Sequence, residues 1–512
     1  MAHNKPSNSC PKPLIISLIF SSISLTFLAS TLKPKFQLTD DTFSRHHHPT
    51  NINSKWFDLL APNIHGGKIK IGLVNVDDNM RQAYTHMAGR LEAVNVDFQN
   101  VSTKLKWGDF FPLSIDEDEK WGPPSCPEIP LPRLEEYGGL NFIVAGVPCG
   151  ARGTENKGIR DVFRCDDLLT HAGDYWVYKP NLWKLKEKVL MPAGSCQIAP
   201  LHAETRKYSQ SSPAIERSPS SRHKRVAYAT VLHSSEAYVC GAIALAQSIL
   251  QSNSTHDPIL LHDSSLSPNS LQGLRDAGWK PRLIQPIRSP FAQNGSYNEW
   301  NYSKLRTWQL TEYDKVIFVD ADLIVLKNIN KFFNYPQLSA APNDQVIFNS
   351  GIMVIEPSTC MFEDLRSKSH KLVSYNGGDQ GYLNEVFTWW HRLPFRLNYL
   401  KISKRPKEKG NNYIREDIYA IHFLGLKPWA CYKDYDCNWD MVDRHIFASD
   451  SAHKKWWQVH DAMPKKLQQY CALTRKMDER IKKWRGIAKD TELPNGHWKI
   501  EVRDPRQYHL VE

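Results

Sequence analysis

The chain has 512 residues, 41% of them hydrophobic, and a net charge of +11 at pH 7. This length accommodates roughly two to four domains, and the hydrophobic content is ordinary for a globular protein. The basic surplus favours nucleic acid, an anionic membrane or an acidic polymer as a partner. Because no zinc-finger or RNA-binding motif accompanies it, we expect no nucleic-acid partner.

A membrane segment is predicted near the N-terminus. Residues 14–32 are apolar apart from Ser and Thr and carry no charge. A helix of this length spans about 28 Å, close to the thickness of a bilayer core. A cleaved signal peptide ending near Ala29 is the alternative, but the length of the run favours an anchor. We therefore expect a cytosolic tail (1–13), a signal anchor (14–32) and a stem (33–66), as in a single-pass type II membrane protein.

Features of the secretory lumen follow the anchor. Four Asn-x-Ser/Thr tripeptides are glycosylation acceptors in form, at Asn100, Asn253, Asn294 and Asn301. The ten cysteines include no Cys-x-x-Cys pair, which argues against a zinc ribbon. An oxidising lumen allows disulfides. Cys431 and Cys437 are the best candidates for one, and the other pairings cannot be deduced.

An α/β region of unknown role is predicted over residues 67–203. Strand patterns occupy 68–76 and 140–147, with helical patterning at 80–94 and a Pro-rich stretch at 123–132. No chemical motif accompanies them. Residues 204–224 are Ser-rich and basic, which is typical of a linker.

A second α/β region, 225–450, alternates strand and helix patterns. We expect strands at 226–232, 258–261, 281–287, 316–319 and 346–355, and helices at 238–251, 271–278, 302–310 and 360–375. This alternation predicts a parallel, doubly wound sheet. Residues 451–512 form a basic region that is helical at 454–485. It would pack on this domain or contact a membrane or an acidic polymer.

The motif Asp320-Ala321-Asp322 follows the apolar strand at 316–319 directly. Buried carboxylates are costly unless a cation compensates them. Ligands of open α/β sheets bind at the carboxyl ends of the strands, so the motif indicates a divalent metal that holds a phosphorylated ligand. The same spacing at 116–118 and 434–436 lies in polar sequence, where we expect exposed acidic loops.

Three further polar clusters interrupt this region. Asn349-Ser350-Gly351 lies inside an apolar strand and is either a bulge or a ligand-facing turn. The segment 377–381, GGDQG, is either a helix N-cap or a loop that a ligand approaches closely. His422, followed by Gly425 and Lys427, is either a core histidine or a metal ligand beside a phosphate-binding lysine. Two carboxylates and one imidazole favour Mn²⁺, with Mg²⁺ as the alternative.

Taken in order, these motifs resemble glycosyltransferase family 8, the retaining group that includes glycogenin. The resemblance covers about residues 225–430 and rests on YATVLHSSEAYVCGAIAL, KLRTWQL, KVIFVDADLIVLKNI, FNSGIMVIEPS, GGDQGYLNEVF and HFLGLKPW. The flanking sequence FTWWHRLPFRLNYLK is similar to the plant branch, the UDP-glucuronate:xylan α-glucuronosyltransferases.

The resemblance implies a GT-A fold: a Rossmann-like, mostly parallel sheet with helices on both faces, binding a UDP-sugar and Mn²⁺. It implies transfer of glucuronate to xylan in the Golgi for the plant cell wall, with the catalytic domain luminal and a possible complex with other Golgi transferases. The metal ligands would be Asp320, Asp322 and His422, and the catalytic residues Lys304 and Asp379. The donor would also contact Leu232, Ser234, Ser235, Tyr238, Ala321, Asn349, Ser350, Gly351, Gly378, Gln380, Gly425 and Lys427.

Two other functions stay open. A glycogenin-like or galacturonosyl-type transferase would use another donor or acceptor, and a glycan-binding scaffold would have lost catalysis on the same fold. The motifs do not identify the donor. A glucuronate carboxylate would need a cationic partner, for which Arg288 and Arg396 are candidates.

Overall fold

The computed structural model describes residues 60, 68–76, 91–96, 106–110, 139–146, 163–172, 175–182, 184–185, 225–388, 390–402 and 414–512. The chain divides into two compact units, one of residues 1–98 and 132–182 and the other of residues 99–131 and 183–512. Over the described ranges, no helix is both long enough and apolar enough to cross a membrane. The predicted anchor at 14–32 lies outside these ranges.

The first unit contains a five-stranded sheet in the order β2-β1-β3-β5-β4. Its strands are β1 (Ile69–Val74), β2 (Leu91–Asn95), β3 (Phe142–Gly146), β4 (Leu168–Ala172) and β5 (Tyr175–Tyr178). The strands predicted at 68–76 and 140–147 are confirmed as β1 and β3. The helix expected at 80–94 is wrong at its end, because β2 pairs with β1 in parallel from Leu91 onward. The Pro-rich stretch lies outside the described residues.

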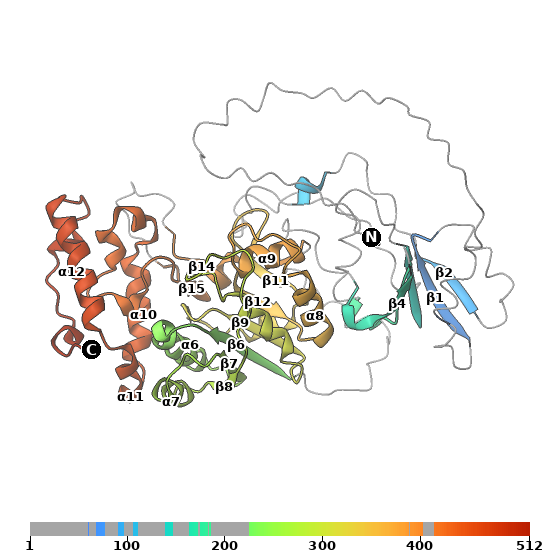
Figure 1. The fold of residues 1–512 in the computed structure, drawn as a ribbon, viewed down its shortest axis with the longest axis horizontal. Helices are drawn as coiled ribbons and strands as arrows, with labels where there is room; N and C mark the ends of the chain where they lie inside the picture. The colour runs from blue at the N-terminus through green and yellow to red at the C-terminus, as the bar shows by residue number, and fades with distance from the viewer. Residues whose placement is uncertain are drawn as a thin grey trace, which may run out of the picture. The chain divides into compact units, whose positions relative to one another are not determined.

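The second unit is built on a seven-stranded sheet in the order β13-β11-β12-β9-β6-β7-β8 (Figure 1). Its strands are β6 (Val226–Leu232), β7 (Asp257–His262), β8 (Lys280–Leu283), β9 (Lys315–Val319), β11 (Ser339–Pro342), β12 (Phe348–Ile355) and β13 (His391–Arg392). The pairs from β9 through β8 are parallel, as predicted. β12 is antiparallel to both β9 and β11, so the sheet is mixed on that side.

Helices cover both faces of this sheet. α6 (Val239–Gln251) buries Ile243 and Leu245 in one core, together with Ile317 of β9. On the other face Phe318 packs in a separate core with residues of α8 (Thr359–Lys368) and α9 (Asp379–Val386). Successive strand residues point to opposite faces, so β9 contributes to both cores.

Two predicted helices differ from the structure. The segment expected to be helical at 302–310 is a 3₁₀ helix, η8 (Tyr302–Gln309). The helix expected at 360–375 ends at Lys368. Beyond it the Ser374 hydroxyl donates to the Gly378 carbonyl at 2.7 Å, and the Gly378 amide donates to Asn376 Oδ1 at 2.9 Å. These side chains compete with helical hydrogen bonds and form a turn instead.

A small second sheet brings distant segments to the end of β9. It contains β10 (Leu323–Val325), β15 (Ala420–His422) and β14 (Tyr399–Leu400), in the order β10-β15-β14. β10 and β15 are antiparallel, with Leu323 opposite His422. This pairing places the last residue of β15 beside the loop 320–322.

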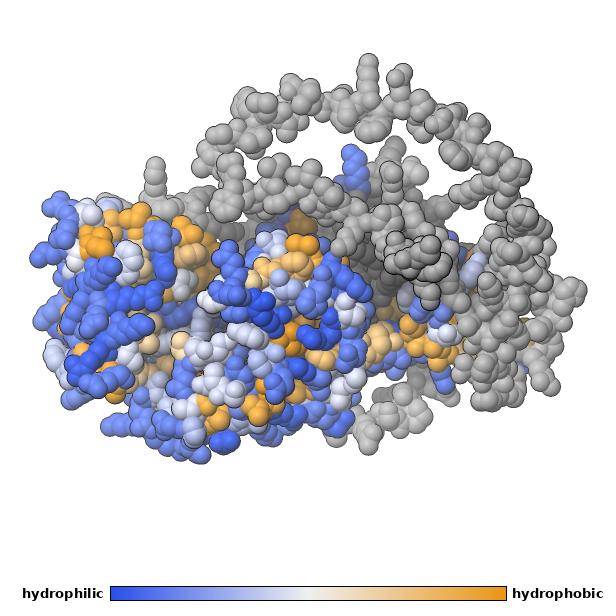
Figure 2. Space-filling view, viewed as in Figure 1, coloured by the Kyte–Doolittle hydropathy of each residue, from blue (hydrophilic) through white to orange (hydrophobic). Residues whose placement is uncertain are grey.

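The C-terminal region packs on the sheet domain. Its helices are α10 (Asp450–Asp461), α11 (Lys465–Gln468) and α12 (Arg475–Asp490). Trp456 and Trp457 of α10 are buried, and a disulfide joins Cys240 of α6 to Cys471. The face over α12 in Figure 2 is mostly hydrophilic, with a few hydrophobic residues. The buried tryptophans and the disulfide show that this region packs on the sheet domain, as predicted. Contact with a membrane or an acidic polymer stays a prediction.

The predicted Cys431–Cys437 disulfide is confirmed. The exposed acidic loop expected at 434–436 is wrong for Asp436, which is only 1% exposed. Its carboxylate accepts from Lys401 Nζ at 2.7 Å and from the Ser449 amide at 2.9 Å. These charged and polar donors explain how a carboxylate is accommodated in the interior.

Candidate active site

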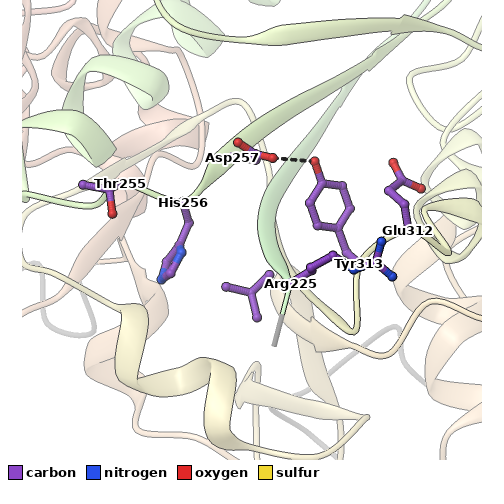
Figure 3. Close-up of a pocket in the computed structure, with 7 residues that line it drawn as sticks. Arg225, Thr255, His256, Asp257, Glu312 and Tyr313 are labelled. Carbon is purple, nitrogen blue, oxygen red and sulfur yellow. Dashed lines mark hydrogen bonds between the residues drawn. The ribbon is translucent and has the colours of Figure 1, made fainter. Parts of the chain in front are cut away.

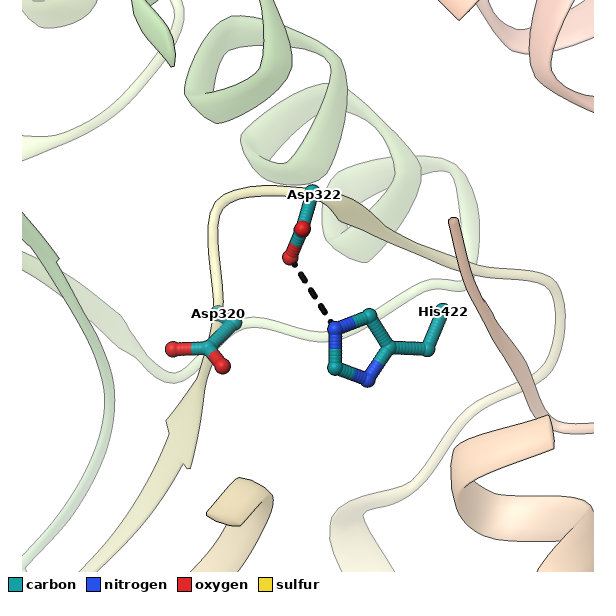
Figure 4. A group of neighbouring side chains, drawn as sticks. All are labelled: Asp320, Asp322 and His422. Atoms are coloured by element: carbon teal, nitrogen blue, oxygen red, sulfur yellow. Dashed lines mark ion pairs between the residues drawn. The ribbon is translucent and has the colours of Figure 1, made fainter. Parts of the chain in front are cut away.

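Asp320, Asp322 and His422 converge at the carboxyl end of β9 (Figure 4). One ligand atom of each lies within 4.8 Å of the others. Asp322 Oδ1 is 3.2 Å from His422 Nε2. The backbone fixes both sides of the group, since the Asp320 amide donates to the Gly351 carbonyl at 2.8 Å and the Phe423 amide donates to the Asp322 carbonyl at 3.0 Å.

The chemistry of this donor set fits a divalent cation. Carboxylate oxygens and an imidazole nitrogen suit Mn²⁺, and the carboxylates also suit Mg²⁺. Asp322 and His422 are each 6% exposed, so a cation would compensate charge that water reaches poorly. In the part of the chain that the structure describes, no other His, Cys, Asp and Glu side chains are grouped in this way.

Lys304 joins the triad to α9. Its Nζ lies 3.0 Å from Asp320 Oδ1 and 2.6 Å from Asp379 Oδ2, and it donates to the Ser350 carbonyl at 3.2 Å. Burial opposes the charge of Lys304, but the two carboxylates outweigh it and raise its pKa to about 12. Lys304 therefore stays a cation within the site.

The two aspartates of the motif have opposite electrostatic environments. Burial raises the pKa of Asp320 to about 6, against the opposing effect of Lys304. Burial acts in the same direction on Asp322, but Lys427 and His422 outweigh it and lower the pKa of that carboxyl. Lys427 Nζ lies 2.6 Å from Asp322 Oδ2. Asp322 is therefore the more strongly stabilised anion of the two.

The start of α9 faces the amino-terminal part of β12. The Ser350 hydroxyl donates to Asp379 Oδ2 at 2.7 Å, and the Ser350 amide donates to Gln380 Oε1 at 3.3 Å. Gly378 occupies the N-cap position, where an added Cβ would meet Asn298 Oδ1 at 2.9 Å. The helix N-cap predicted for this segment is therefore observed at Gly378, and its contact with a ligand stays a prediction.

The loop after β15 holds Lys427 beside the triad. Gly425 has a φ of +76°, and a Cβ there would lie 2.5 Å from Asn438 Oδ1, so only glycine fits without displacement. Lys427 Nζ also donates to the Phe423 carbonyl at 2.5 Å and lies 5.8 Å from the centre of the Tyr238 ring. One ammonium group therefore faces both the Asp322 carboxylate and the Tyr238 ring.

The loop between β6 and α6 carries the remaining predicted donor contacts. Leu232 is buried at the end of β6, whereas Ser234 and Ser235 are exposed. Ser234 has a φ of +66°, and its amide donates to Asp263 Oδ2 at 2.9 Å. The Ser235 hydroxyl accepts from the Ala237 amide at 3.4 Å, so it caps the following turn.

Two predicted small residues shape the site instead of offering side chains to it. A Cβ on Gly351 would lie 2.6 Å from His422 Cε1, so glycine leaves room for the imidazole. Ala321 is buried, and its carbonyl would meet a Cβ on Gly241 at 2.4 Å. The loop 320–322 therefore packs directly on α6.

The two arginine candidates for a donor carboxylate are each paired with an acid. Arg288 Nε lies 3.0 Å from Glu299 Oε1, and Arg396 Nε lies 3.1 Å from Asp417 Oδ2. Neither of these two acids belongs to the group around Lys304, so the ion pairs do not bring the arginines into the triad.

The sequence interpretation missed Asp263, which holds the Ser234 loop, and Asn398, whose amide reaches both Asn349 and His422. Asp263 follows the strand β7 directly, and this position was an available signal. Asn398 is the last residue of a short 3₁₀ helix, and nothing in its local sequence distinguishes it.

A separate, open pocket of about 380 Å³ lies at the amino-terminal ends of β6 and β7 (Figure 3). It is lined by Arg225, Val226, Thr255, His256, Asp257, Glu312 and Tyr313. Asp257 accepts from the Tyr313 hydroxyl at 2.8 Å and pairs with Lys280 at 2.6 Å. None of the predicted site residues lines this pocket.

Comparison with known proteins matches two families. Residues 229–338 and 337–432 match glycosyl transferase family 8, and residues 49–162 and 153–196 match the GUX1-5 N-terminal domain. The chain is 46% identical to the putative UDP-glucuronate:xylan alpha-glucuronosyltransferase 4 of Arabidopsis thaliana, covering 99% of each chain. It is also 46% identical to the UDP-glucuronate:xylan alpha-glucuronosyltransferase 2 of that plant, covering 86% of this chain and 81% of the relative.

More distant matches follow. Human glycogenin-1 is 29% identical over 44% of this chain and 70% of its own length. Among solved structures, the galactosyltransferase LgtC in complex with donor and acceptor sugar analogues aligns with a TM-score of 0.34 and 15% identity, covering 47% of this chain and 99% of that one.

Proposed function

We propose that this chain, which belongs to glycosyl transferase family 8, transfers a glucuronosyl group from UDP-glucuronate to xylan. The observation that carries the proposal is at the carboxyl end of β9. There two carboxylates and one imidazole, which could hold a metal, lie together with Lys304 and Lys427. The similarity to xylan glucuronosyltransferases over nearly the whole chain supports the choice of donor and acceptor.

Asp320, Asp322 and His422 would hold the cation, Mn²⁺ in preference to Mg²⁺. When bound, such an ion acts as a Lewis acid that stabilises the charge of a departing diphosphate. Lys427, already beside Asp322, would add positive charge to the same leaving group.

Lys304, Ser350 and Asp379 form the side of the site that would face the donor sugar. In a retaining front-face displacement, the bond between sugar C1 and the phosphate oxygen breaks with its electron pair going to that oxygen. The acceptor hydroxyl forms the new bond to C1 on the same face, and its proton passes to the departing phosphate oxygen. Lys304 lies between Asp320 and Asp379, where its charge would hold the two carboxylates in place during transfer.

The proposed setting is the Golgi lumen. An anchor at 14–32 would hold the protein in the membrane, with the stem at 33–66 and the linker at 204–224 on either side of the 67–203 region. The catalytic domain would comprise 225–450. A complex with other Golgi transferases belongs to the same proposal.

The test is a donor screen on the full-length protein. UDP-glucuronate and UDP-glucose are each supplied with xylo-oligosaccharide and Mn²⁺, and the products are identified by mass spectrometry. We expect glucuronate transfer that chelation abolishes and that Asp322→Asn lowers by about 100-fold or more. Asp434→Asn, in the exposed part of another Asp-x-Asp motif, serves as the matched control.

Three outcomes would contradict the proposal. Transfer of glucose alone would exclude the xylan glucuronosyltransferase. A gain in mass of the protein itself with UDP-glucose would support a glycogenin-like transferase. Absence of transfer from both donors by folded protein would support a glycan-binding scaffold.

A further inference from the structure

Asn398 lies between a metal ligand and a residue of the predicted donor site. It ends η10 (Phe395–Asn398), immediately before β14, and is 1% exposed. Its Oδ1 is 3.2 Å from His422 Nδ1, and its Nδ2 donates to Asn349 Oδ1 at 2.8 Å. One buried amide therefore joins the two sides of the site.

The direction of these hydrogen bonds follows from a backbone amide that cannot be reversed. The Gly351 amide donates to Asn349 Oδ1 at 2.9 Å, so this oxygen, and not the side-chain nitrogen of Asn349, faces Asn398. Asn398 must then present its own nitrogen to Asn349. Its oxygen is left facing the imidazole of His422.

An amide oxygen accepts only, so it requires a proton on Nδ1 of His422. In a neutral imidazole the lone pair is then on Nε2. Nε2 is the nitrogen that lies 3.2 Å from Asp322 Oδ1, on the side of the triad. The ring is also held sterically, because Gly351 leaves only enough space for it against β12.

We propose that Asn398 is a positioning residue, which sets the tautomer of His422 for metal binding and is itself oriented by the Gly351 amide through Asn349. This inference rests on the proposed metal site. It links the donor-sugar strand β12 to the metal ligand on β15 through two side chains. Groups that hydrogen-bond to a metal-ligating histidine usually contribute about 10- to 100-fold to metal affinity.

The test measures Mn²⁺ binding directly, by electron paramagnetic resonance of the free ion during titration of the full-length protein. Asn398→Ala removes both hydrogen bonds, and we expect about 10- to 100-fold weaker Mn²⁺ binding. Asn398→Asp keeps an acceptor oxygen for His422, so we expect Mn²⁺ binding as tight as in wild type or tighter. It also places a carboxylate oxygen against the acceptor oxygen of Asn349, so we expect a raised KM for the nucleotide sugar. Asn343→Ala is the control. It removes the 3.3 Å bond that Asn349 donates to Asn343 and an exposed bond to Asp344, but neither bond of Asn398, so Mn²⁺ affinity should be unchanged.

A second measurement does not depend on the folding of a variant. In metal-free wild-type protein with ¹⁵N-labelled histidine, we expect Nδ1 of His422 to carry a proton for Asn398, whether or not Asp322 also holds one on Nε2. An unprotonated Nδ1 would overturn the proposal.

The outcomes separate the positioning role of Asn398 from the metal site itself. If wild-type protein binds no Mn²⁺, the metal site fails, and the proposed mechanism fails with it. If wild type binds Mn²⁺ and folded Asn398→Ala binds it equally well, only the positioning role is overturned. Equal losses in Asn398→Ala and Asn398→Asp would also overturn it, since they would show that packing and not the acceptor oxygen matters.

Discussion

At the scale of single residues, Arg288 is the better placed of the two arginine candidates for a donor carboxylate. The neighbouring Ser289 hydroxyl donates to the Gly377 carbonyl at 2.6 Å, so this segment is held beside the turn that precedes Asp379. Arg396 instead pairs with Asp417, which is 39% exposed. A glucuronate carboxylate would compete with Glu299 for the Arg288 guanidinium.

We therefore expect Arg288→Gln to raise the KM for UDP-glucuronate by about tenfold, the equivalent of about 1.4 kcal/mol. The KM for UDP-glucose should change little, because glucose lacks the carboxylate. Arg396→Gln is the control, measured by the same initial-rate assay. A larger effect of Arg396→Gln would reverse the assignment.

Residue exposure also separates the glycosylation acceptors. Asn253 is exposed at the end of α6, whereas the Asn301 side chain is half-buried and donates to Asn298 Oδ1 at 3.0 Å. If the domain is luminal, Asn253 should carry a glycan and Asn301 should not. Glycopeptide mass spectrometry before and after endoglycosidase treatment measures this, with Asn253→Gln as the control. A glycan on Asn301 would contradict the described geometry.

At the residue scale, Asp320 and Asp322 could be predicted because two carboxylates interrupt an apolar strand pattern. Asn398 could not, because its role depends on Asn349 and His422, which are distant in sequence. An asparagine at the end of a short 3₁₀ helix has the same local sequence signal whether it faces solvent or the imidazole of His422.

At the scale of elements, the loop after β15 depends on the segment that follows the Cys431–Cys437 disulfide. Asn438 Oδ1 accepts from the Leu426 amide at 2.8 Å, and Asn438 Nδ2 donates to the Leu426 carbonyl at 3.1 Å. Asp436 holds Asn438 in turn, through a contact of 2.6 Å. The position of Lys427 therefore rests on a buried hydrogen-bond network outside the site.

We expect Asn438→Ala to raise the KM for the UDP-sugar by about tenfold with a smaller change in kcat, because Lys427 would lose its fixed position. The loss in the free energy of unfolding should be about 1–3 kcal/mol, since the Leu426 backbone groups lose their partner. Initial rates and denaturant unfolding measure the two effects. Asn328→Ala, which removes exposed bonds to the Ser252 carbonyl and from the Asn330 amide, is the control. An unchanged KM in folded Asn438→Ala would contradict this role.

The strands of the second unit were predicted well, because buried strands leave apolar runs with turn residues between them. The antiparallel pairing of β12 and the 3₁₀ form of η8 were not visible. Both depend on tertiary neighbours, and short segments adopt whichever hydrogen bonds those neighbours offer.

For the whole molecule, the Cys240–Cys471 disulfide connects positions 231 residues apart. Closing so long a loop restricts the unfolded chain strongly, so replacing both cysteines with alanine should cost about 2–5 kcal/mol of the free energy of unfolding. Removal of Cys431–Cys437, with a separation of 6 residues, should cost less. Denaturant unfolding of both double variants is the measurement. Equal losses would count against the loop-length explanation.

A buried ion pair between Arg506 and Asp504 stabilises the C-terminal segment. Arg506 Nη2 lies 2.6 Å from Asp504 Oδ2, and its Nη1 donates to the Cys471 carbonyl at 2.9 Å. Burial opposes the charge of Asp504, but its bonds to Arg506 and to backbone amides, including that of Lys433, outweigh it and lower its pKa. A depressed carboxyl pKa stabilises the folded state above the unfolded value, and this contribution is lost as pH falls through the folded pKa.

Asp504→Asn should therefore be about 3–5 kcal/mol less stable than wild type at neutral pH, because Arg506 is left uncompensated. The difference should narrow as pH falls below about 4, the ordinary value for an unfolded aspartate. Urea unfolding across this pH range tests it. Asp443→Asn, whose carboxylate is 77% exposed, should show no such trend. A pH-independent difference would exclude the ion pair as its cause.

The sequence by itself determined the family, the α/β class of the second unit, the motif Asp320-Ala321-Asp322 and the Cys431–Cys437 disulfide. These features can be predicted along the chain, because apolar periodicity, short spacings and motif order do not depend on which distant segments meet in space. The tertiary structure decided the charge partners of Lys304, the burial of Asp436 and the hydrogen bonds of Asn398 to Asn349 and His422. Hydrogen-bond direction and burial depend on which distant segments the fold brings together, and the order of residues along the chain does not record them.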